Sequence, residues 1–351
     1  MKTISRKTAL LFLLPALLVA SCGREGLEPD AGGAGVSFSV SENIPELRTK
    51  APKVFTSAEA DVQALDFAVW AYNMPAAGSA ATAWLLDGGT SAPVQASYDS
   101  EKKDWRPATN ISFNTSGRDA AWQTRWFALG PWAAYNGSGA NITGLTLADG
   151  SAPAPLYTVP SGSLAGTRHF DLLAAVSADR SVGTVTPVEL KFCHVLTGIR
   201  FKREKGLDIS NITVSGVYDR AALAMEKVPV DGNLSACVNV DNTGDDTDLW
   251  QGRSRSVAAP AFSLAPETWT NGRPGDPTKE TQYDYAASDA DILMMIPQFT
   301  PEGAKISITV NGVTVSGDIS GCNFVSADFG KISFSSFRKS RFSRFQKTLL
   351  S

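Results

Sequence analysis

The stretch 305–317, KISITVNGVTVSG, constrains the fold of this chain more than any other part of its sequence. Two segments that alternate apolar and polar residues flank Asn311-Gly312, a pair that two-residue type I′ turns favour because both residues tolerate positive φ. Such a turn sets the register of the hairpin. Its apolar pairs are then Val310 with Val313 and Ile308 with Val315, and its polar pairs are Thr309 with Thr314 and Ser307 with Ser316. Because each face is uniform on both strands, the stretch predicts an antiparallel β-hairpin.

Strand patterns recur along the whole chain, whereas helical patterns do not. Residues 36–40 alternate with a period of two, and 65–72 place one apolar set on a single face: Leu65, Phe67, Val69 and Ala71. Further apolar or aromatic runs lie at 125–129, 132–135, 171–176, 188–201, 212–217, 237–240 and 292–296. Only 58–64 has a helical pattern, and the Gly-, Pro- and Asp-rich stretch 271–291 predicts a long surface loop. Many short strands without regular helices indicate antiparallel β-sandwiches, with a break between two units at 177–187.

The composition narrows the function classes. The chain has 351 residues, of which 43% are apolar, so it can bury a sizeable core. Its formal net charge of −3 argues against nucleic acid as a partner. It has two histidines and lacks the G-x-S-x-G, H-E-x-x-H, G-x-G-x-x-G and phosphate-loop motifs. The sequence therefore indicates no enzyme, no metal site and no cofactor.

The N-terminus reads as an export signal. Three basic residues precede the apolar run 9–20, which is shorter than the roughly 20 residues that span a bilayer. The run ends in Val19-Ala20-Ser21-Cys22, which resembles a bacterial lipobox. The resemblance implies that residues 1–21 are a lipoprotein signal peptide, that cleavage falls between Ser21 and Cys22, that Cys22 is acylated, and that 22–35 form a tether. An ordinary signal peptide with a chance cysteine is the alternative.

The remaining cysteines and the histidines do not form a catalytic set. Cys193, Cys237 and Cys322 are odd in number, which is compatible with one disulfide but favours buried free thiols. Cys193 and His194 are neighbours in a predicted strand, so their side chains point to opposite faces. We expect His194 to be a packed or hydrogen-bonded structural residue and His169 to be exposed.

Two further groups have both a structural and a functional interpretation. One is an acidic cluster without the spacing of a calcium loop, for which a solvated loop is favoured over a weak Ca²⁺ site: Asp241, Asp245, Asp246 and Asp248. The other is a set of tryptophans that suits either a sugar-binding surface or packing between sheets, with packing favoured: Trp105, Trp122, Trp126 and Trp132.

Four segments together resemble the fimbrillin superfamily of Bacteroidetes pilus subunits (FimA/Mfa-like proteins). The strongest match is 171–201, whose DLLAAV and PVELKFCHVLTGIRF are similar to the family's DLL-x-A and V-x-L-x-F-x-H-x-L-x-x-I-x-F. Supporting matches are the lipobox with 36–51 after it, the segment 125–136, and 293–331, which ends in Gly330-Lys331. Residues 332–351 depart from the family's final strand and form an atypical basic tail.

The resemblance implies an all-β fold of two tandem transthyretin-like antiparallel β-sandwich domains, at 36–183 and 184–331, followed by the tail 332–351. It implies export as a lipoprotein to the outer membrane and trimming by an arginine-specific protease, which removes the first strand of the N-terminal domain. A C-terminal strand of another subunit then fills the exposed groove, and main-chain hydrogen bonds supply the affinity.

Particular residues of this chain fit that mechanism. The candidate displaced strand consists of Val36, Phe38 and Val40, because an alternating apolar strand can fill a groove. Removal of such a strand leaves a row of unpaired backbone N–H and C=O groups. Arg48 follows this strand in a proline-flanked polar segment. The candidate maturation cleavage therefore lies between Arg48 and Thr49. An ordinary surface arginine is the alternative interpretation of Arg48.

The sequence thus predicts a structural or accessory subunit of cell-surface fimbriae, a type V-like pilus, which assembles by protease-triggered donor-strand exchange and contributes to adhesion. Its expected partners are other fimbrial subunits, an arginine-specific protease, the outer membrane through the lipid anchor, and a host protein or glycan. Its expected location is the surface of the outer membrane and the fimbrium. The alternative is a lipid-anchored glycan-binding or adhesin surface lipoprotein that does not polymerise.

Overall fold

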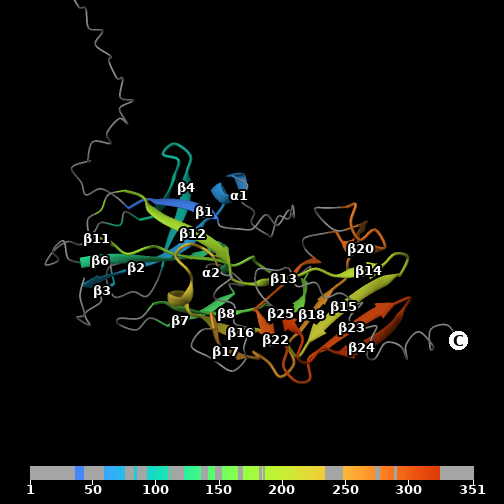
Figure 1. The fold of residues 1–351 in the computed structure, drawn as a ribbon. Helices are drawn as coiled ribbons and strands as arrows, with labels where there is room; N and C mark the ends of the chain where they lie inside the picture. Colours follow the sequence, from blue (N-terminus) through green and yellow to red (C-terminus); the bar gives the residue numbers. More distant parts are fainter. Residues whose placement is uncertain are drawn as a thin grey trace, which may run out of the picture. The chain divides into compact units, whose positions relative to one another are not determined.

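The structure is a computed structural model that is mainly β, with several sheets (Figure 1). The residues that it describes are 36–42, 59–75, 83–84, 93–109, 111, 122–135, 141–146, 152–164, 169–181, 184, 186–233, 248–272, 277–287 and 291–324. They belong to one compact unit. The predicted β-rich class is confirmed at this level, and the division into two tandem transthyretin-like sandwiches stays a prediction. The predicted signal peptide 1–21, tether 22–35 and tail 332–351 lie outside the described residues.

Helices are short. The described helices are α1 (Glu59–Gln63), α2 (Trp132–Tyr135) and the 3₁₀ turn η2 (Met225–Lys227). α1 falls inside the one stretch with a helical pattern in the sequence. None of the helices in the described ranges is long and apolar enough to cross a membrane.

Seven strands close into a barrel. Around the ring their order is β6, β10, β12, β1, β5, β4 and β2, and β2 pairs back with β6. Their bounds are β1 (Phe38–Glu42), β2 (Phe67–Pro75), β4 (Val94–Asp99), β5 (Asp104–Pro107), β6 (Trp122–Gly130), β10 (Leu173–Val176) and β12 (Val188–His194). β3 (Ala83–Trp84) and β11 (Arg180–Ser181) extend the sheet beside β2 and β6.

Strands β2, β6 and β10 bury apolar residues on both faces, which explains why they read as continuous apolar runs, whereas β1 has a polar outer face. The predicted face of 65–72 points into the barrel. There it joins the barrel core, whose buried members are Val36, Phe38, Leu65, Phe67, Val69, Ala71, Ala96, Trp105, Ile111, Trp126, Ala128, Leu173, Ala175, Val188, Leu190 and Phe192. The alternate residues of β2, such as Trp70, belong to a second core with the remaining sheets, which includes Tyr157, Trp250 and Phe262.

The remaining strands form smaller sheets, of order β17-β16-β8-β7, β24-β23-β15-β18-β9 and β14-β20-β19, besides the pairs β13–β21 and β22–β25. The first sheet contains β7 (Ile142–Thr146), β8 (Ala154–Thr158), β16 (Arg220–Leu223) and β17 (Trp250–Ser254). The second contains β9 (Gly162–Ser163), β15 (Ile209–Ser215), β18 (Ala261–Leu264), β23 (Lys305–Val310) and β24 (Val313–Asp318). The others are β13 (Thr197–Ile199), β14 (Lys202–Glu204), β19 (Trp269–Asn271), β20 (Tyr283–Ala286), β21 (Leu293–Met295), β22 (Gln298–Phe299) and β25 (Asn323–Phe324).

The apolar run 188–201 serves several sheets. It supplies β12 to the barrel and β13 to the pair with β21, and β14 follows directly in the three-stranded sheet. β12 begins at Val188, beyond the predicted boundary at 183, and it pairs with β1 and β10 from the other side of that boundary. The barrel therefore takes strands from both predicted halves. The division into domains at 36–183 and 184–331 stays a prediction.

The hairpin prediction is confirmed. β23 and β24 pair in the predicted register, from Lys305 opposite Asp318 to Val310 opposite Val313. The turn residues Asn311 and Gly312 have φ of 48° and 78°, as the type I′ assignment requires. The predicted loop at 271–291, in contrast, contains strand β20, so the loop prediction is wrong over those residues. β20 carries two tyrosines, and its pairing with β14 buries part of both residues.

Candidate functional site

The candidate displaced strand is the predicted site that the structure describes. Val36 lies just before β1, and Phe38 and Val40 lie within it. The other predicted site residues lie outside the described residues: Ser21, Cys22, Arg48 and Thr49. Acylation, signal cleavage and maturation cleavage therefore stay predictions.

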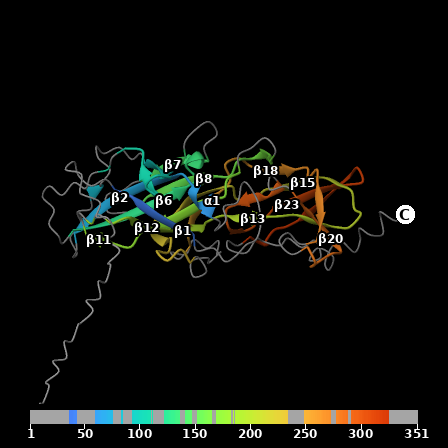
Figure 2. The same ribbon diagram turned by 90° about the horizontal axis from the view of Figure 1, so that it is seen from above.

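β1 is inserted in the wall of the barrel, between β12 and β5, and both views show it beside β12 (Figures 1 and 2). It runs parallel to β12 over its whole length and antiparallel to β5. The pairs with β12 are Phe38 with Val188, Ser39 with Glu189, Val40 with Leu190, Ser41 with Lys191 and Glu42 with Phe192. Because parallel neighbours need a long connection, the first described strand is held by a strand that comes much later in the chain.

Phe38 anchors β1 in the barrel core. Its side chain is fully buried, and its ring centroid lies 5.2 Å from that of Trp126 and 5.9 Å from that of Phe67, both in edge-to-face geometry. Burying one phenylalanine contributes about 1.5–3 kcal/mol, and each such aromatic pair adds about 0.5–1.5 kcal/mol. Val36 is buried as well, whereas Ser39 and Ser41 are exposed. β1 therefore directs its apolar side inward and its hydroxyls outward, as the alternation predicts.

The two strands beside β1 are unequal partners. β12 pairs along all of β1, and the N–H of Val188 also donates to the carbonyl of Ser37 at 2.8 Å. β5 pairs with β1 at a single position, where Trp105 stands opposite Phe38. The indole Nε1 of Trp105 donates to the carbonyl of Leu65 at 3.0 Å, so this residue is held by a contact outside β1.

Both walls of the slot have support of their own. β12 pairs with β10 on its other side, and β5 pairs with β4. Loss of β1 alone would therefore leave two paired strands facing a gap, with backbone groups along β12 and the rings of Trp126 and Phe67 uncovered. Such a gap in a sheet is a template for another strand. We call this gap the β1 slot.

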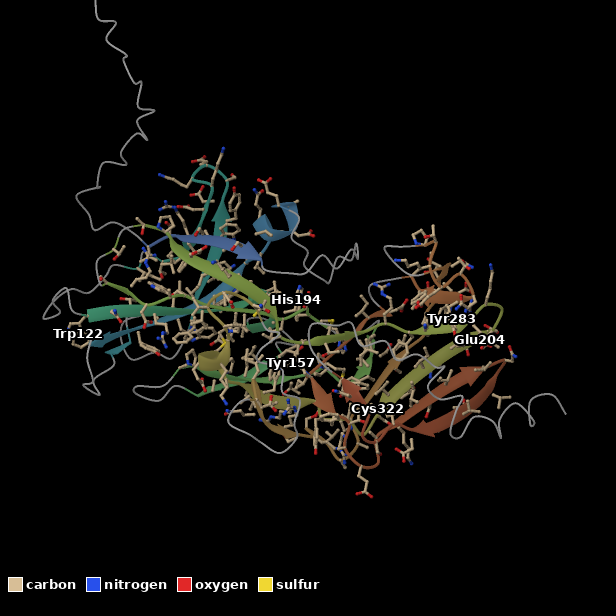
Figure 3. All side chains as sticks on the ribbon, in the orientation of Figure 1. Trp122, Tyr157, His194, Glu204, Tyr283 and Cys322 are labelled. Carbon is tan, nitrogen blue, oxygen red and sulfur yellow. The ribbon has the colours of Figure 1, made fainter. Side chains whose placement is uncertain are left out.

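Of the two expectations for histidines, the one for His194 is confirmed and the one for His169 is not. His194 ends β12 (Figure 3), and its Nδ1 lies 2.7 Å from Oδ1 of Asp171, whose side chain is fully buried. The expectation of a hydrogen-bonded structural histidine is confirmed. His169 is 2% exposed and packs edge-on against Phe262, so the expectation that it is exposed is wrong. No local pattern in the sequence marks its burial in the second core.

Neither of the two cysteines that the structure describes forms a disulfide. Cys193 is buried, and its Sγ lies 3.3 Å from the carbonyl of Ala174, whereas Cys322 is half-buried. Cys193 belongs to the second core, on the opposite side of β12 from Phe192 in the barrel core. This alternation is what the sequence predicts for a strand. Cys237 lies outside the described residues.

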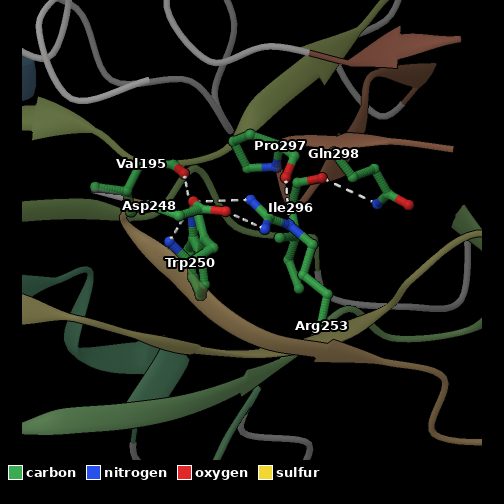
Figure 4. Close-up of polar contacts among 7 residues, drawn as sticks. All are labelled: Val195, Asp248, Trp250, Arg253, Ile296, Pro297 and Gln298. Carbon is green, nitrogen blue, oxygen red and sulfur yellow. Dashed lines mark hydrogen bonds and ion pairs between the residues drawn. The ribbon is translucent and has the colours of Figure 1, made fainter. Parts of the chain in front are cut away.

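Asp248 is part of a buried ion pair rather than of a solvated loop. Its carboxylate binds the guanidinium of Arg253, and both side chains are nearly buried (Figure 4). Arg253 Nε also donates to the carbonyl of Pro297 at 2.9 Å, and the N–H of Trp250 donates to Asp248 at 3.0 Å. The solvated-loop interpretation is wrong for Asp248. The other members of the predicted acidic cluster lie outside the described residues: Asp241, Asp245 and Asp246.

Trp105, Trp126 and Trp132 pack as the favoured interpretation predicts, and Trp122 is half-buried. Trp126 is 1% exposed and Trp105 is 6% exposed, and both belong to the barrel core. Trp132 packs against the second core, and its ring lies 5.3 Å from that of Tyr135. The four predicted tryptophans thus form no common exposed platform. Within the described ranges, no group of three or more His, Cys, Asp or Glu side chains could hold a metal ion.

Comparison with known proteins gives similar structures but no family. No family model matches the chain, and no curated protein matches it. Among solved structures, a candidate cell adhesion protein from Bacteroides ovatus is 15% identical with a TM-score of 0.38, over 81% of this chain and 85% of that one. A candidate cell adhesion protein from Bacteroides uniformis is 16% identical with a TM-score of 0.41, over 83% and 86%.

A fimbrial protein from Bacteroides ovatus is also similar, at 12% identity and a TM-score of 0.29. The match covers 82% of this chain and 46% of that one. At TM-scores this low a shared function does not follow. The function proposed below rests on the geometry of β1.

Proposed function

We propose that this chain is a structural or accessory subunit of a cell-surface fimbria of the type V kind, assembled by protease-triggered strand exchange and contributing to adhesion. The observation that supports it most is the position of β1. This first strand of the barrel fills a gap between two strands that are each paired elsewhere. It ends at Glu42, six residues before the candidate cleavage at Arg48.

Cleavage after Arg48 would convert a tethered strand into a separate peptide. While the chain is intact, the connection keeps β1 at a high effective concentration beside its slot. After cleavage, only its pairing with β12 and β5 and the burial of its apolar side chains, Phe38 above all, hold it. Another strand that is present at sufficient concentration can then replace it. The backbone N–H and C=O groups of β12, from Val188 onward, provide the edge with which this strand pairs.

The sequence supplies the rest of the proposal. Acylation at Cys22 would hold the precursor on the outer membrane, with 22–35 as its tether, and trimming by an arginine-specific protease would release the body from the anchor. Two transthyretin-like domains would form the body. The alternative, a glycan-binding surface lipoprotein that does not polymerise, needs an exposed aromatic surface, and the burial of Trp105 and Trp126 removes two of the rings considered for it.

The test is trimming of the unlipidated chain 23–351 by an arginine-specific protease, followed by sequencing of the new N-terminus and sizing. We expect a new N-terminus at Thr49 and ladders that resist detergent. Arg48→Lys should remain monomeric, while the matched Arg24→Lys, which alters a site before β1, should assemble normally. A chain that is cut after Arg48, loses β1 and remains monomeric would contradict the proposal.

A further inference from the structure

Strand β24 forms one edge of the five-stranded sheet. Among the strands that the structure describes it pairs with β23 alone, so one side of its backbone faces away from the sheet (Figure 1). The type I′ turn makes Val310 and Val313 a hydrogen-bonded pair, and hydrogen-bonded pairs then recur at every second residue. The backbone N–H and C=O groups of the intervening residues Thr314 and Ser316 therefore point to the outer side of the sheet edge.

β24 lacks the features that protect the other edges. Short length, charged side chains and bulges keep edge strands from pairing with another chain. Among the described edge strands, β3, β9 and β11 have two residues each, β19 and the members of the two-stranded sheets have two or three, β14 consists of three charged residues, and β7 and β17 have register shifts against their neighbours. β24 pairs with β23 over six residues without a shift, and Asp318 is its one charged residue. It is therefore the described edge that is best suited to accept another strand.

A second copy of β24 is a complementary partner for this edge. An antiparallel pair about a two-fold axis at Ser316 brings Ser316 opposite Ser316 of the second copy, and Thr314 opposite Asp318. Val315 then lies opposite Gly317, which has no side chain to compete for the space. Outward residues thus pair with outward residues, and each face of the sheet continues across the contact. The two Asp318 carboxylates lie at opposite ends, whereas a parallel pair in register would place these like charges side by side.

We propose that two copies of this chain pair edge to edge through β24, antiparallel and centred on Ser316, and so join their five-stranded sheets into one. The backbone N–H and C=O groups of Thr314 and Ser316 supply the hydrogen bonds, as in other cases of strand addition. Because the same patch is used on both sides of a two-fold axis, the contact closes after two copies. It uses neither β1 nor cleavage at Arg48, so it is independent of the proposed function.

The pairing is expected to be weak. A single pair of edge strands buries less surface than the roughly 1,200–2,000 Å² of stable protein interfaces, and small interfaces belong to transient contacts. We therefore expect a dissociation constant on the order of 10⁻⁴ M. The copies are then mostly apart at micromolar concentration, and they pair as the concentration approaches the millimolar range.

Sedimentation equilibrium of the unlipidated chain 23–351 over about 5–500 μM tests the pairing around this dissociation constant. We expect the average mass to rise from monomer toward dimer, and Ser316→Lys, which sets two ammonium groups opposite each other, to weaken pairing by about tenfold or more. Ser307→Lys is the matched control: it has the same net charge and loses the same 2.7 Å contact between the hydroxyls of Ser307 and Ser316, but it lies on β23. It should pair as the wild type does. A wild type that stays monomeric throughout, or equal pairing of the two variants, would overturn the proposal.

Cysteine cross-linking tests the register. In a hydrogen-bonded antiparallel pair the two Cα atoms lie about 5.5 Å apart, a distance that a disulfide bridges. Ser316→Cys should therefore give covalent dimers under mild oxidation, with the wild type as the control for the native cysteines. Thr314→Cys lies opposite Asp318 of the second copy and should not cross-link to itself. Equal cross-linking of the two variants, or bridging mainly between mixed Thr314→Cys and Ser316→Cys chains, would overturn the proposed register.

Discussion

Strands β1 and β24 are short alternating strands whose presence the sequence predicts, yet they occupy opposite situations. β24 pairs with the strand directly before it and ends a five-stranded sheet, with most of its residues exposed. β1 lies between two strands that are distant in sequence, and Phe38 is fully buried. Loss of β24 would only make β23 the new edge strand of its sheet, whereas loss of β1 would open a closed barrel.

The comparison shows that alternation alone does not identify a functional strand. Both strands alternate, and they differ in how many neighbouring strands pair with them: β1 has one on each side, whereas β24 has one. The neighbours of β1 are paired on their other sides, so they can persist as a slot when it leaves. The position of a strand in the sheet order therefore matters more than its alternation. Exchange is expected for a strand such as β1, which comes first among the described strands and completes the ring of the barrel.

The largest expected difference concerns Phe38. Phe38→Ala should lower the free energy of unfolding by about 3–5 kcal/mol, because it leaves a cavity beside Trp126 and Phe67. Val313→Ala, in the exposed first position of β24, should change it by about 0.5 kcal/mol or less. Urea unfolding of both variants measures the contrast, and similar losses would show that β1 is not the better-anchored strand.

The dependence of stability on alkaline pH tests the burial of Tyr157 in the second core. Burial raises the pKa of the Tyr157 hydroxyl in the second core. Above the ordinary tyrosine pKa of about 10, the unfolded chain loses this proton while the native chain keeps it, so stability falls as the pH rises toward the folded pKa. Tyr157→Phe should therefore have a shallower loss of stability than the wild type between about pH 9 and 11 in urea titrations. Equal slopes would contradict this origin.

One identical change at two sites isolates the effect of burial. Val36→Thr places a hydroxyl in the barrel core and should cost about 1–3 kcal/mol. Val313→Thr places the same hydroxyl in solvent and should be nearly neutral. The midpoints of urea unfolding give both values. Comparable costs would mean that Val36 does not belong to the barrel core in solution.

The smallest expected effect concerns the hairpin turn. Gly312 has φ of 78°, and a Cβ added there meets no other atom within 4 Å, so the cost of Gly312→Ala is conformational rather than steric. We expect a loss of about 1 kcal/mol from the left-handed backbone. The hairpin should keep its register, which exchange of the amides of the hydrogen-bonded pair Ile308 and Val315 would report, and a shifted pattern would refute it.

Local patterns predicted what depends on neighbours in sequence. Asn311-Gly312 set the hairpin register, and the alternation around Phe67 identified the face that enters the barrel. The parallel pairing of β1 with β12 could not be predicted in the same way, since register between distant strands depends on packing of the whole barrel. The burial of His169 was missed because it packs against Phe262, far along the chain. The Asp248–Arg253 pair is local, but its burial was missed because it depends on distant segments such as the one with Pro297.

The candidate site was predictable in part. Val36, Phe38 and Val40 were identified as an apolar strand because their pattern is local. The unequal edges of the slot were not, since neither Trp105 nor Val188 has a pattern that pairs it with β1.

Hydrogen exchange followed by mass spectrometry tests the central claim most directly, with β23–β24 as an internal reference. The amides of β12 at 188–192 are to be compared in the intact chain, in the trimmed chain without β1, and after assembly. We expect protection of β12 to fall when β1 leaves and to return on assembly, while the protection of β23–β24 stays constant. Assembly of trimmed subunits with unchanged protection of β12 throughout would contradict the claim that β1 fills an exchangeable slot.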